Sequence, residues 1–341
     1  MDLKSEQPIA NERISNGSSN EVVTHKKSGG KIKRHCRRFW WLDLIILAII
    51  VLVVVLPLIF VAIPKKAQHD LNASTLEVTS QEVTSPAPDG IHLKLVTTAR
   101  SGSKFHPTIE AFRAGLSLEG KEPFLYIDVP ETKANAETQI VVEQDLKFAS
   151  LGQFVDYNKV VMGSEEFDVS MNGKTKLKLS GLRAMSVDYN KKITMKGLNK
   201  LNGLNITDLK VLSGAGVVLD DGSNLIGNLT IPNPSVMTLD LGNVTMNLAV
   251  DGKSIGTTLI PNLILVPGTN HVPMQSTVNQ LAIISLIKSK YTNGVLPLDI
   301  VGNSSVSGDQ HLTYYEAAIQ SNTIRIDLNV GPALAAVNIT V

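Results

Sequence analysis

Hydrophobic positions divide the chain into one long apolar segment and many short segments in which apolar and polar residues alternate. The long segment runs from Leu44 to Ile63 without a charged side chain, and Trp40 and Trp41 precede it. About 20 apolar residues cross the hydrocarbon core of a bilayer, and tryptophans are enriched at its two interfaces. We therefore predict a transmembrane helix over residues 39–63. The two alternatives are a buried core helix and a cleaved signal peptide. The apolar segments of both are usually shorter than this one.

Basic residues predict how this helix is oriented. Residues 1–38 carry nine Lys/Arg and four Asp/Glu, whereas only Lys65 and Lys66 closely follow the apolar segment. Because cytosolic flanks carry the excess of positive charge, we expect a type II signal-anchor, with a cytosolic N-terminus and residues 64–341 lumenal or extracellular. The tail is rich in Asn, Ser, Gly and charge and is predicted to be disordered. Cys36 lies beside the membrane, where a palmitoylated and an unmodified thiol both fit the sequence.

Beyond the membrane the alternation is typical of antiparallel strands with one buried face. Residues 64–90 contain Ser, Thr, Pro and charge, and we predict a stalk there. Alternating segments flank Asn172-Gly173 and Asp251-Gly252, dipeptides that favour tight hairpin turns, so a hairpin is predicted at each. Within residues 244–250 the alternation places Leu248 toward the core and Asn247 toward solvent.

Two segments have helical spacing instead, residues 151–162 and residues 277–291. They align with each other when the chain is compared with itself at the offset that places Phe167 on Leu296. The same offset places Val169 on Leu298 and Met171 on Ile300. We therefore predict a mainly β fold of two tandem antiparallel β-sandwich domains, each with a short helix. The predicted domains are residues 91–212 and residues 213–341.

The second predicted domain contains an Asn-Pro block, Ile-Pro-Asn-Pro-Ser at residues 231–235, followed by Pro-Gly-Thr-Asn at residues 267–270. Proline cannot donate to a strand ladder, so Pro234 suits the end of a strand. Residues 228–280 resemble group-two late embryogenesis abundant domains, also called water-stress and hypersensitive-response domains. The closer resemblance is to fungal membrane-anchored proteins that carry such a domain in the lumen. The resemblance implies a sandwich fold, a binding or protective role, and a vacuolar or other endomembrane location.

Charge and composition narrow the function further. Residues 64–341 carry a net charge of −3, which argues against a nucleic-acid partner. A single cysteine excludes an internal disulfide and a cysteine-built metal site. The five histidines after the membrane segment include no closely spaced pair, and the chain has no Gly-x-Ser-x-Gly and no Asp-x-Asp. We accordingly predict no catalytic, cofactor-binding or metal-binding residues and no cofactor. A type II lumenal enzyme of glycan metabolism is the alternative.

Six Asn-x-Ser/Thr sequons lie after the membrane segment. Asn72 is close to the bilayer, and Asn16 has a sequon on the predicted cytosolic side. The predicted glycosylation sites are the other five, Asn205, Asn228, Asn243, Asn303 and Asn338. The sequence thus predicts a membrane-bound, non-enzymatic binding or scaffolding module. Its partner is either a lipid, held between the sheets or beside the helix of residues 277–291, or a lumenal protein.

Overall fold

The computed structural model describes residues 30–212 and 218–339, with side chains from Trp40 onward. The chain forms two units, Met1–Leu58 and Ile59–Val341. The first unit contains α1 (Gly30–Pro57), and the chain remains helical through η1 (Leu58–Ala62) and α2 (Ile63–Ala73). The π-helical turn η1 directly follows Pro57, whose missing N–H interrupts the regular hydrogen-bond ladder.

The predicted transmembrane segment lies within one helix that is long and apolar enough to cross a membrane. None of its most apolar window is buried. This exposure argues against the alternative of a soluble core helix and is compatible with a single-pass anchor. The disordered tail is predicted over residues 1–38, and this is wrong for residues 30–38, which form the first turns of α1. The rest of the predicted tail, residues 1–29 with Asn16, lies outside the described residues, and so does the side chain of Cys36.

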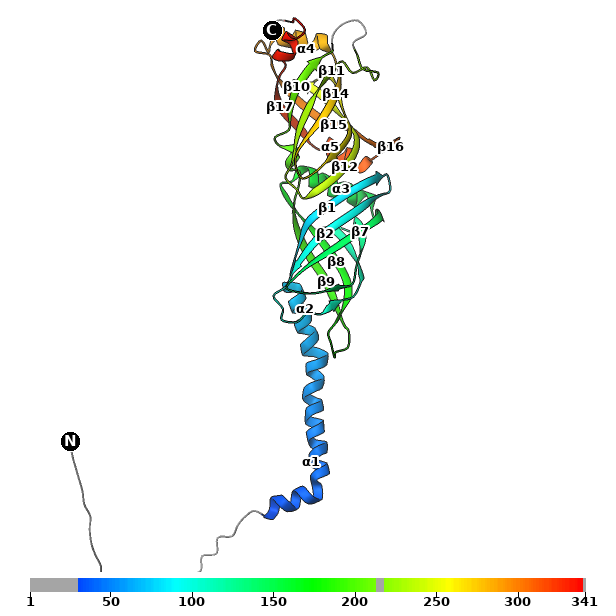
Figure 1. Ribbon diagram of the computed structural model, residues 1–341, viewed down its shortest axis with the longest axis vertical. Helices are drawn as coiled ribbons and strands as arrows, with labels where there is room; N and C mark the ends of the chain where they lie inside the picture. Colours follow the sequence, from blue (N-terminus) through cyan, green and yellow to red (C-terminus); the bar gives the residue numbers. More distant parts are fainter. Residues whose placement is uncertain (1–29, 213–217, 340–341) are drawn as a thin grey trace, which may run out of the picture. The chain divides into compact units, whose positions relative to one another are not determined.

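The Ile59–Val341 unit is mainly β, as predicted, and contains two sheets (Figure 1). The larger sheet has a continuous path of eight strands. In spatial order they are β10 (Asn205–Val211), β11 (Leu225–Asn233), β14 (Gly268–Val278), β13 (Lys253–Leu265), β12 (Met237–Val250), β1 (Thr75–Ala87), β2 (Gly90–Arg100) and β7 (Glu137–Lys147). Three more strands join this sheet through β12, namely β15 (Val295–Ser307), β16 (Gln310–His311) and β17 (Thr323–Asn329).

The smaller sheet follows the order β5 (Leu125–Val129), β4 (Phe112–Leu118), β8 (Glu166–Lys178), β3 (Thr108–Ile109) and β6 (Thr132–Lys133), with β9 (Met185–Lys196) paired to β8. The helices of this unit besides α2 are α3 (Leu151–Gly163), η2 (Asn199–Leu201), α4 (Gln280–Ser289), α5 (Thr313–Gln320) and α6 (Gly331–Ala335).

The internal repeat extends to the strand pairing. The series β1, β2, β4, β5, β7, α3, β8, β9 recurs along the chain as β10, β11, β12, β13, β14, α4, β15, β17. Each antiparallel pair of the first series has its counterpart in the second, for example β2–β7 and β11–β14, or β8–β9 and β15–β17. The offset that places Phe167 on Leu296 also carries the whole of β8 onto β15. The two copies therefore share these pairings. They differ at one place, because β13 pairs with β14 in the second copy but β5 does not pair with β7 in the first, so the first copy is divided between the two sheets.

One parallel pairing joins the two copies. Residues 81–83 of β1 pair in parallel with residues 237–239 of β12, while the other strand pairs of the described chain are antiparallel. Aromatic side chains from both copies also meet, because Phe148 and Phe154 contact Tyr314 of α5 at ring-centroid distances of 5.1 and 5.0 Å. The larger sheet thus runs across the boundary predicted at residues 212–213.

Several local predictions are confirmed. The segment at 151–162 is α3, whose N-cap Ser150 accepts a hydrogen bond from the Gln153 N–H. The turn at Asp251-Gly252 connects β12 to β13 with φ values of 51° and 74°, a geometry that glycine and aspartate tolerate. Leu248 is buried and Asn247 exposed. The helix predicted over residues 277–291 exists as α4 and is shorter, since it begins after its N-cap Asn279 and ends at Ser289.

Two predictions about residues 64–341 are wrong. Residues 64–90 do not form a stalk, because α2 and β1 occupy them and β1 lies in the interior of the larger sheet. Asn172-Gly173 is not a turn, because β8 runs straight through it. A Cβ on Gly173 would lie 2.8 Å from the Arg113 carbonyl oxygen, so this glycine permits β4 to approach β8 closely.

Candidate functional site: an apolar cavity beside α2

A cavity of about 360 Å³ lies beside α2, at the end of the Ile59–Val341 unit where that helix packs. Its walls come from both sheets: β2 and β7 of the larger sheet, and β3, β6, β8 and β9 of the smaller one. The buried lining residues are Ile109, Ile140, Leu177 and Tyr189. These four form an apolar floor, and a volume of this size is typical of small-molecule sites.

Helix α2 closes one side of the cavity with Ile63, Ala67 and Leu71, which follow one another at four-residue spacing along one face. Gln68 fixes the helix to β9, since its amide both donates to the Asp188 carbonyl at 2.8 Å and accepts from the Asp188 N–H at 2.9 Å. In this way a side chain of α2 pairs with the backbone of β9.

Lys191 of β9 holds the C-terminal end of α2. Its ammonium group donates to the Ser74 carbonyl at 2.5 Å, to the Ser74 hydroxyl at 2.8 Å and to the Leu71 carbonyl. A cation is favourable there, because the carbonyls at a helix C-terminus carry partial negative charge. Burial nevertheless disfavours the charged form and lowers the pKa of Lys191 to about 8.

The rim of the cavity is polar, in contrast to its floor. Lys66 and Asp70 form an ion pair at 2.9 Å, and the Ser103 hydroxyl donates to Asp70 at 2.8 Å. This cluster connects α2 to the loop of residues 101–107. Phe105 from the same loop is 54% exposed at the opening. Every Ser, Thr, Asn, Asp and Lys that lines the cavity is exposed or half-buried, so apart from the Tyr189 hydroxyl the buried part of the lining is apolar.

The second copy has a buried helix in the connection where the first copy has a loop. The loop of residues 179–184 between β8 and β9 lines the cavity, whereas the matching connection between β15 and β17 contains α5. Leu312, Tyr314 and Ile319 from this connection are buried, and Ile319 packs so closely on β15 that a Cβ on Gly302 would lie 2.3 Å from it. The cavity is therefore a feature of the first copy and does not follow from the shared strand pairings alone.

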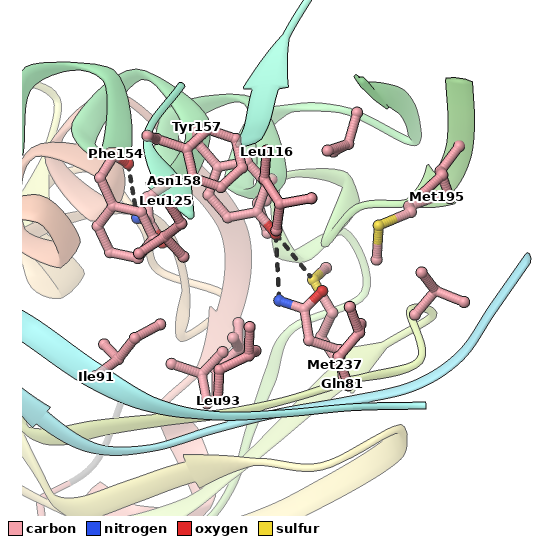
Figure 2. Close-up of a pocket in the computed structure, with 18 of the residues that line it drawn as sticks. Gln81, Ile91, Leu93, Leu116, Leu125, Phe154, Tyr157, Asn158, Met195 and Met237 are labelled. Carbon is pink, nitrogen blue, oxygen red and sulfur yellow. Dashed lines mark hydrogen bonds between the residues drawn. The ribbon is translucent and has the colours of Figure 1, made fainter. Parts of the chain in front are cut away.

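A second, much smaller cavity of about 40 Å³ lies in the core under α3 (Figure 2). Figure 2 shows Gln81 donating to the Tyr157 hydroxyl at 3.3 Å, and that hydroxyl in turn pointing to the Met237 sulfur at 3.9 Å. Burial raises the pKa of Tyr157 to about 12. Since a single water needs at least about 10–15 Å³, this space fits about three waters and no larger ligand.

The predicted helical lipid site at residues 277–291 has little free volume. The space beside α4 is about 40 Å³. Ile283 and Ile287 are buried there, while Leu281 is 82% exposed. The aliphatic residues of α4 are thus divided between the core and the surface. The larger volume for an apolar ligand lies beside α2 instead.

The structure places four of the predicted glycosylation sites on the surface. Asn205, Asn228, Asn303 and Asn338 are exposed, whereas Asn243 is half-buried and its side-chain oxygen accepts a hydrogen bond from the Asn262 N–H at 2.9 Å. Asn205 and Asn228 lie on the adjacent strands β10 and β11, and the other three lie on different elements. The five are therefore separate surface positions rather than parts of one site.

The Asn-Pro block has a structural role at the junction of β11 and β12. Asn233 is buried and donates to the Met237 carbonyl at 2.8 Å, and its oxygen accepts from the Ser235 N–H at 3.0 Å. Pro234 lies between the two strands, as predicted. Asn270, from the related Pro-Gly-Thr-Asn segment, closes the β13–β14 turn by bonding both backbone groups of Val266.

Within the described ranges, 30–212 and 218–339, no group of three or more His, Cys, Asp or Glu residues could hold a metal ion. Two histidines contact carboxylates near the surface, His92 with Asp145 at 2.7 Å and His311 with Glu316 at 2.5 Å. Both pairs lie away from the cavity lining. The chemistry that the cavity offers is therefore burial of hydrocarbon next to a polar rim.

The cavity is not predicted from the sequence, because residues 64–90 are interpreted there as a stalk. A signal is nevertheless present: Ile63, Ala67 and Leu71 recur every four residues among polar neighbours, which is the pattern of an amphipathic helix. Sequence reasoning also misses Lys191. This lysine follows Tyr189 and precedes Ile193 at period two, so it occupies an inward position of β9.

Comparisons with known proteins add a family match over part of the chain. Residues 122–248, from just before β5 to near the end of β12, match the family described as "Protein of unknown function (DUF3712)". This region contains α3, β8 and β9 and crosses from the first copy into the second. No curated protein matches the chain.

Solved structures give only remote likenesses. The periplasmic chaperone SfaE is 12% identical, with 74% of this chain and 98% of that chain covered and a TM-score of 0.20. The E. coli chaperone DraB is 12% identical over 75% of this chain and 98% of that chain, also with a TM-score of 0.20. A bacterial adhesin from Mobiluncus mulieris is 11% identical over 67% of this chain and 81% of that chain, with a TM-score of 0.18. Such scores carry no inference about function.

Proposed function

We propose that this protein is a single-pass, type II membrane protein whose Ile59–Val341 unit is a non-enzymatic binding module in the lumen or outside the cell. We further propose that its ligand is apolar and binds in the cavity beside α2. The observation that carries the proposal is the cavity itself, about 360 Å³ with a floor of Ile109, Ile140, Leu177 and Tyr189.

The position of the cavity along the chain supports a membrane-derived ligand. Ile63 is the last residue of the apolar segment and also lines the cavity. The cavity wall therefore begins, along the sequence, where the apolar segment ends. The polar residues that follow, with Lys65 and Lys66 first, are of the kind found at a membrane interface. The resemblance to fungal anchored proteins adds a vacuolar or other endomembrane as the expected location.

The proposal is tested by isolating the full chain from its native membranes in detergent and extracting it for mass spectrometry. We expect one apolar molecule per protein, enriched over a preparation of Ala99→Phe. Ala99 lines the cavity and is half-buried, so a phenylalanine there occupies the space without replacing a large core residue. The control is Ala249→Phe, a half-buried alanine of β12 that does not line the cavity.

A protein partner is the second candidate, and the exposure of strand β17 favours it. This strand pairs with β15, and its apolar side chains, Ile324, Ile326 and Leu328, are only half-buried. Such a sheet edge suits the addition of a strand from another chain. The same preparation also tests the alternative of an enzyme of glycan metabolism. Turnover of a sugar-nucleotide donor by the purified full chain would favour that alternative over a binding module.

A further inference from the structure

From the volume and the polarity of the cavity beside α2, we infer that it binds one hydrocarbon chain of a single-chain amphiphile, such as a fatty acid or a monoacyl lipid. The inference rests on the proposed function and names the class of ligand. At the ~30 Å³ that a water-sized group occupies in a liquid, a cavity of about 360 Å³ holds about a dozen methylenes. The two chains of a membrane phospholipid need more than twice this volume.

The polarity of the lining supports an amphiphile in one orientation. The buried floor of Ile109, Ile140 and Leu177 suits the end of a hydrocarbon chain, because every methylene removed from water makes the free energy of binding more favourable. The charged lining groups are exposed or half-buried, and at this rim Lys66, Asp70 and Ser103 interact with one another. The polar end of the ligand lies at this rim, beside the ammonium of Lys66, whose side chain is 60% exposed.

The site lies in the first copy, and the matching connection of the second copy contains α5, which packs on β15 and α3. The short loop of residues 179–184 in the first copy leaves this volume free and contributes Leu179 and Leu182 to the lining. The structure therefore predicts one hydrocarbon chain per protein molecule rather than two.

The test uses the full chain in detergent micelles and native mass spectrometry, with octanoic, decanoic, dodecanoic and hexadecanoic acid as probes. Binding to the cavity is the difference between the wild-type protein and Ala99→Phe. Each added methylene should raise the affinity about fourfold, the factor that corresponds to ~0.8 kcal/mol per buried methylene. The increase should level off near dodecanoic acid, where the cavity is full.

Ala67→Phe on α2 is a second cavity-filling variant, used if Ala99→Phe does not fold, and Ala249→Phe is the matched control that should bind like the wild type. One fatty acid per protein, lost in the cavity-filling variants and retained in the control, supports the inference. A sterol or a two-chain lipid bound in the cavity would overturn it and leave the proposed function standing. No bound apolar molecule, or equal binding by all variants, would overturn both.

Discussion

A single buried amide organises the Asn-Pro block at the start of β12. Asn233 bonds the Met237 carbonyl and the Ser235 N–H, and its side-chain oxygen also accepts from the Ser235 hydroxyl at 2.6 Å. These three bonds satisfy backbone and side-chain groups that are buried from solvent. The resemblance based on this block therefore has a structural reason that is independent of any ligand.

We predict that Asn233→Ala lowers the free energy of unfolding by about 3 kcal/mol, because two buried backbone groups lose their partners. The measurement is denaturant unfolding of the full chain in micelles, followed by circular dichroism. The control is Asn247→Ala on the exposed face of β12, which should change stability by less than about 0.5 kcal/mol. Similar losses for the two variants would contradict the role given to Asn233.

At the scale of elements, the cavity depends on the contact between helix α2 and strand β9. Lys191 donates three hydrogen bonds to the end of α2 although its side chain is almost fully buried. With a folded-state pKa of about 8, below that of an exposed lysine, the folded protein releases the proton at lower pH than the unfolded chain does. Stability should therefore rise with pH between about 8 and 10.

Between pH 7.5 and pH 9.5, we predict that the free energy of unfolding of the wild type rises by about 2 kcal/mol more than that of Lys191→Met, which has no group to titrate at this position. Lys192→Met is the control, because Lys192 is the next residue, points to the other face of β9 and pairs with Asp168 at 3.0 Å. It should retain the rise. Urea unfolding at the two pH values measures the effect, and a Lys191→Met variant with the same rise as the wild type would refute it.

At the level of elements, the sequence predicts strands best where alternation is strong. Residues 244–250 alternate strictly, and β12 has the expected register. The Asn172-Gly173 hairpin is wrong because glycine has two uses, a tight turn and a close approach of strands, and only the packing of β4 on β8 decides between them. The strand β1 is missed because its outward residues are Thr, Ser and Glu, and because its inward alternation is broken after Val78 by a register shift and by the buried polar Gln81.

At the scale of the whole molecule, the sequence predicts the mainly β fold, the repeat and the apolar anchor helix. It does not predict the parallel pairing of β1 with β12 that joins the two copies, because the partners, such as Gln81 and Met237, are far apart along the chain. The cavity is not predictable either. It is a volume left by packing, and it is lined by the loop of residues 179–184, whose counterpart in the second copy contains a helix.

The predicted orientation has a direct consequence for glycosylation. We expect glycans on some of the exposed sequons, Asn205, Asn228, Asn303 and Asn338, and none on Asn243, whose side chain is half-buried and hydrogen-bonded. Digestion of the endogenous protein with an N-glycosidase should increase its electrophoretic mobility, and Asn243→Gln should leave this shift unchanged. A protein with unchanged mobility after digestion would remove the support for a lumenal Ile59–Val341 unit.

The most direct test of ligand binding beside α2 is photolabelling of the cavity in intact membranes. Membranes containing the full chain are irradiated with a dodecanoic acid that carries a diazirine at its methyl end, and labelled peptides are mapped by mass spectrometry. Because the methyl end lies at the apolar floor, we predict label on peptides that contain Ile109 or Leu177 and its loss in Ala99→Phe. Label confined to residues 44–63 or to α4, or label unaffected by Ala99→Phe, would contradict binding beside α2.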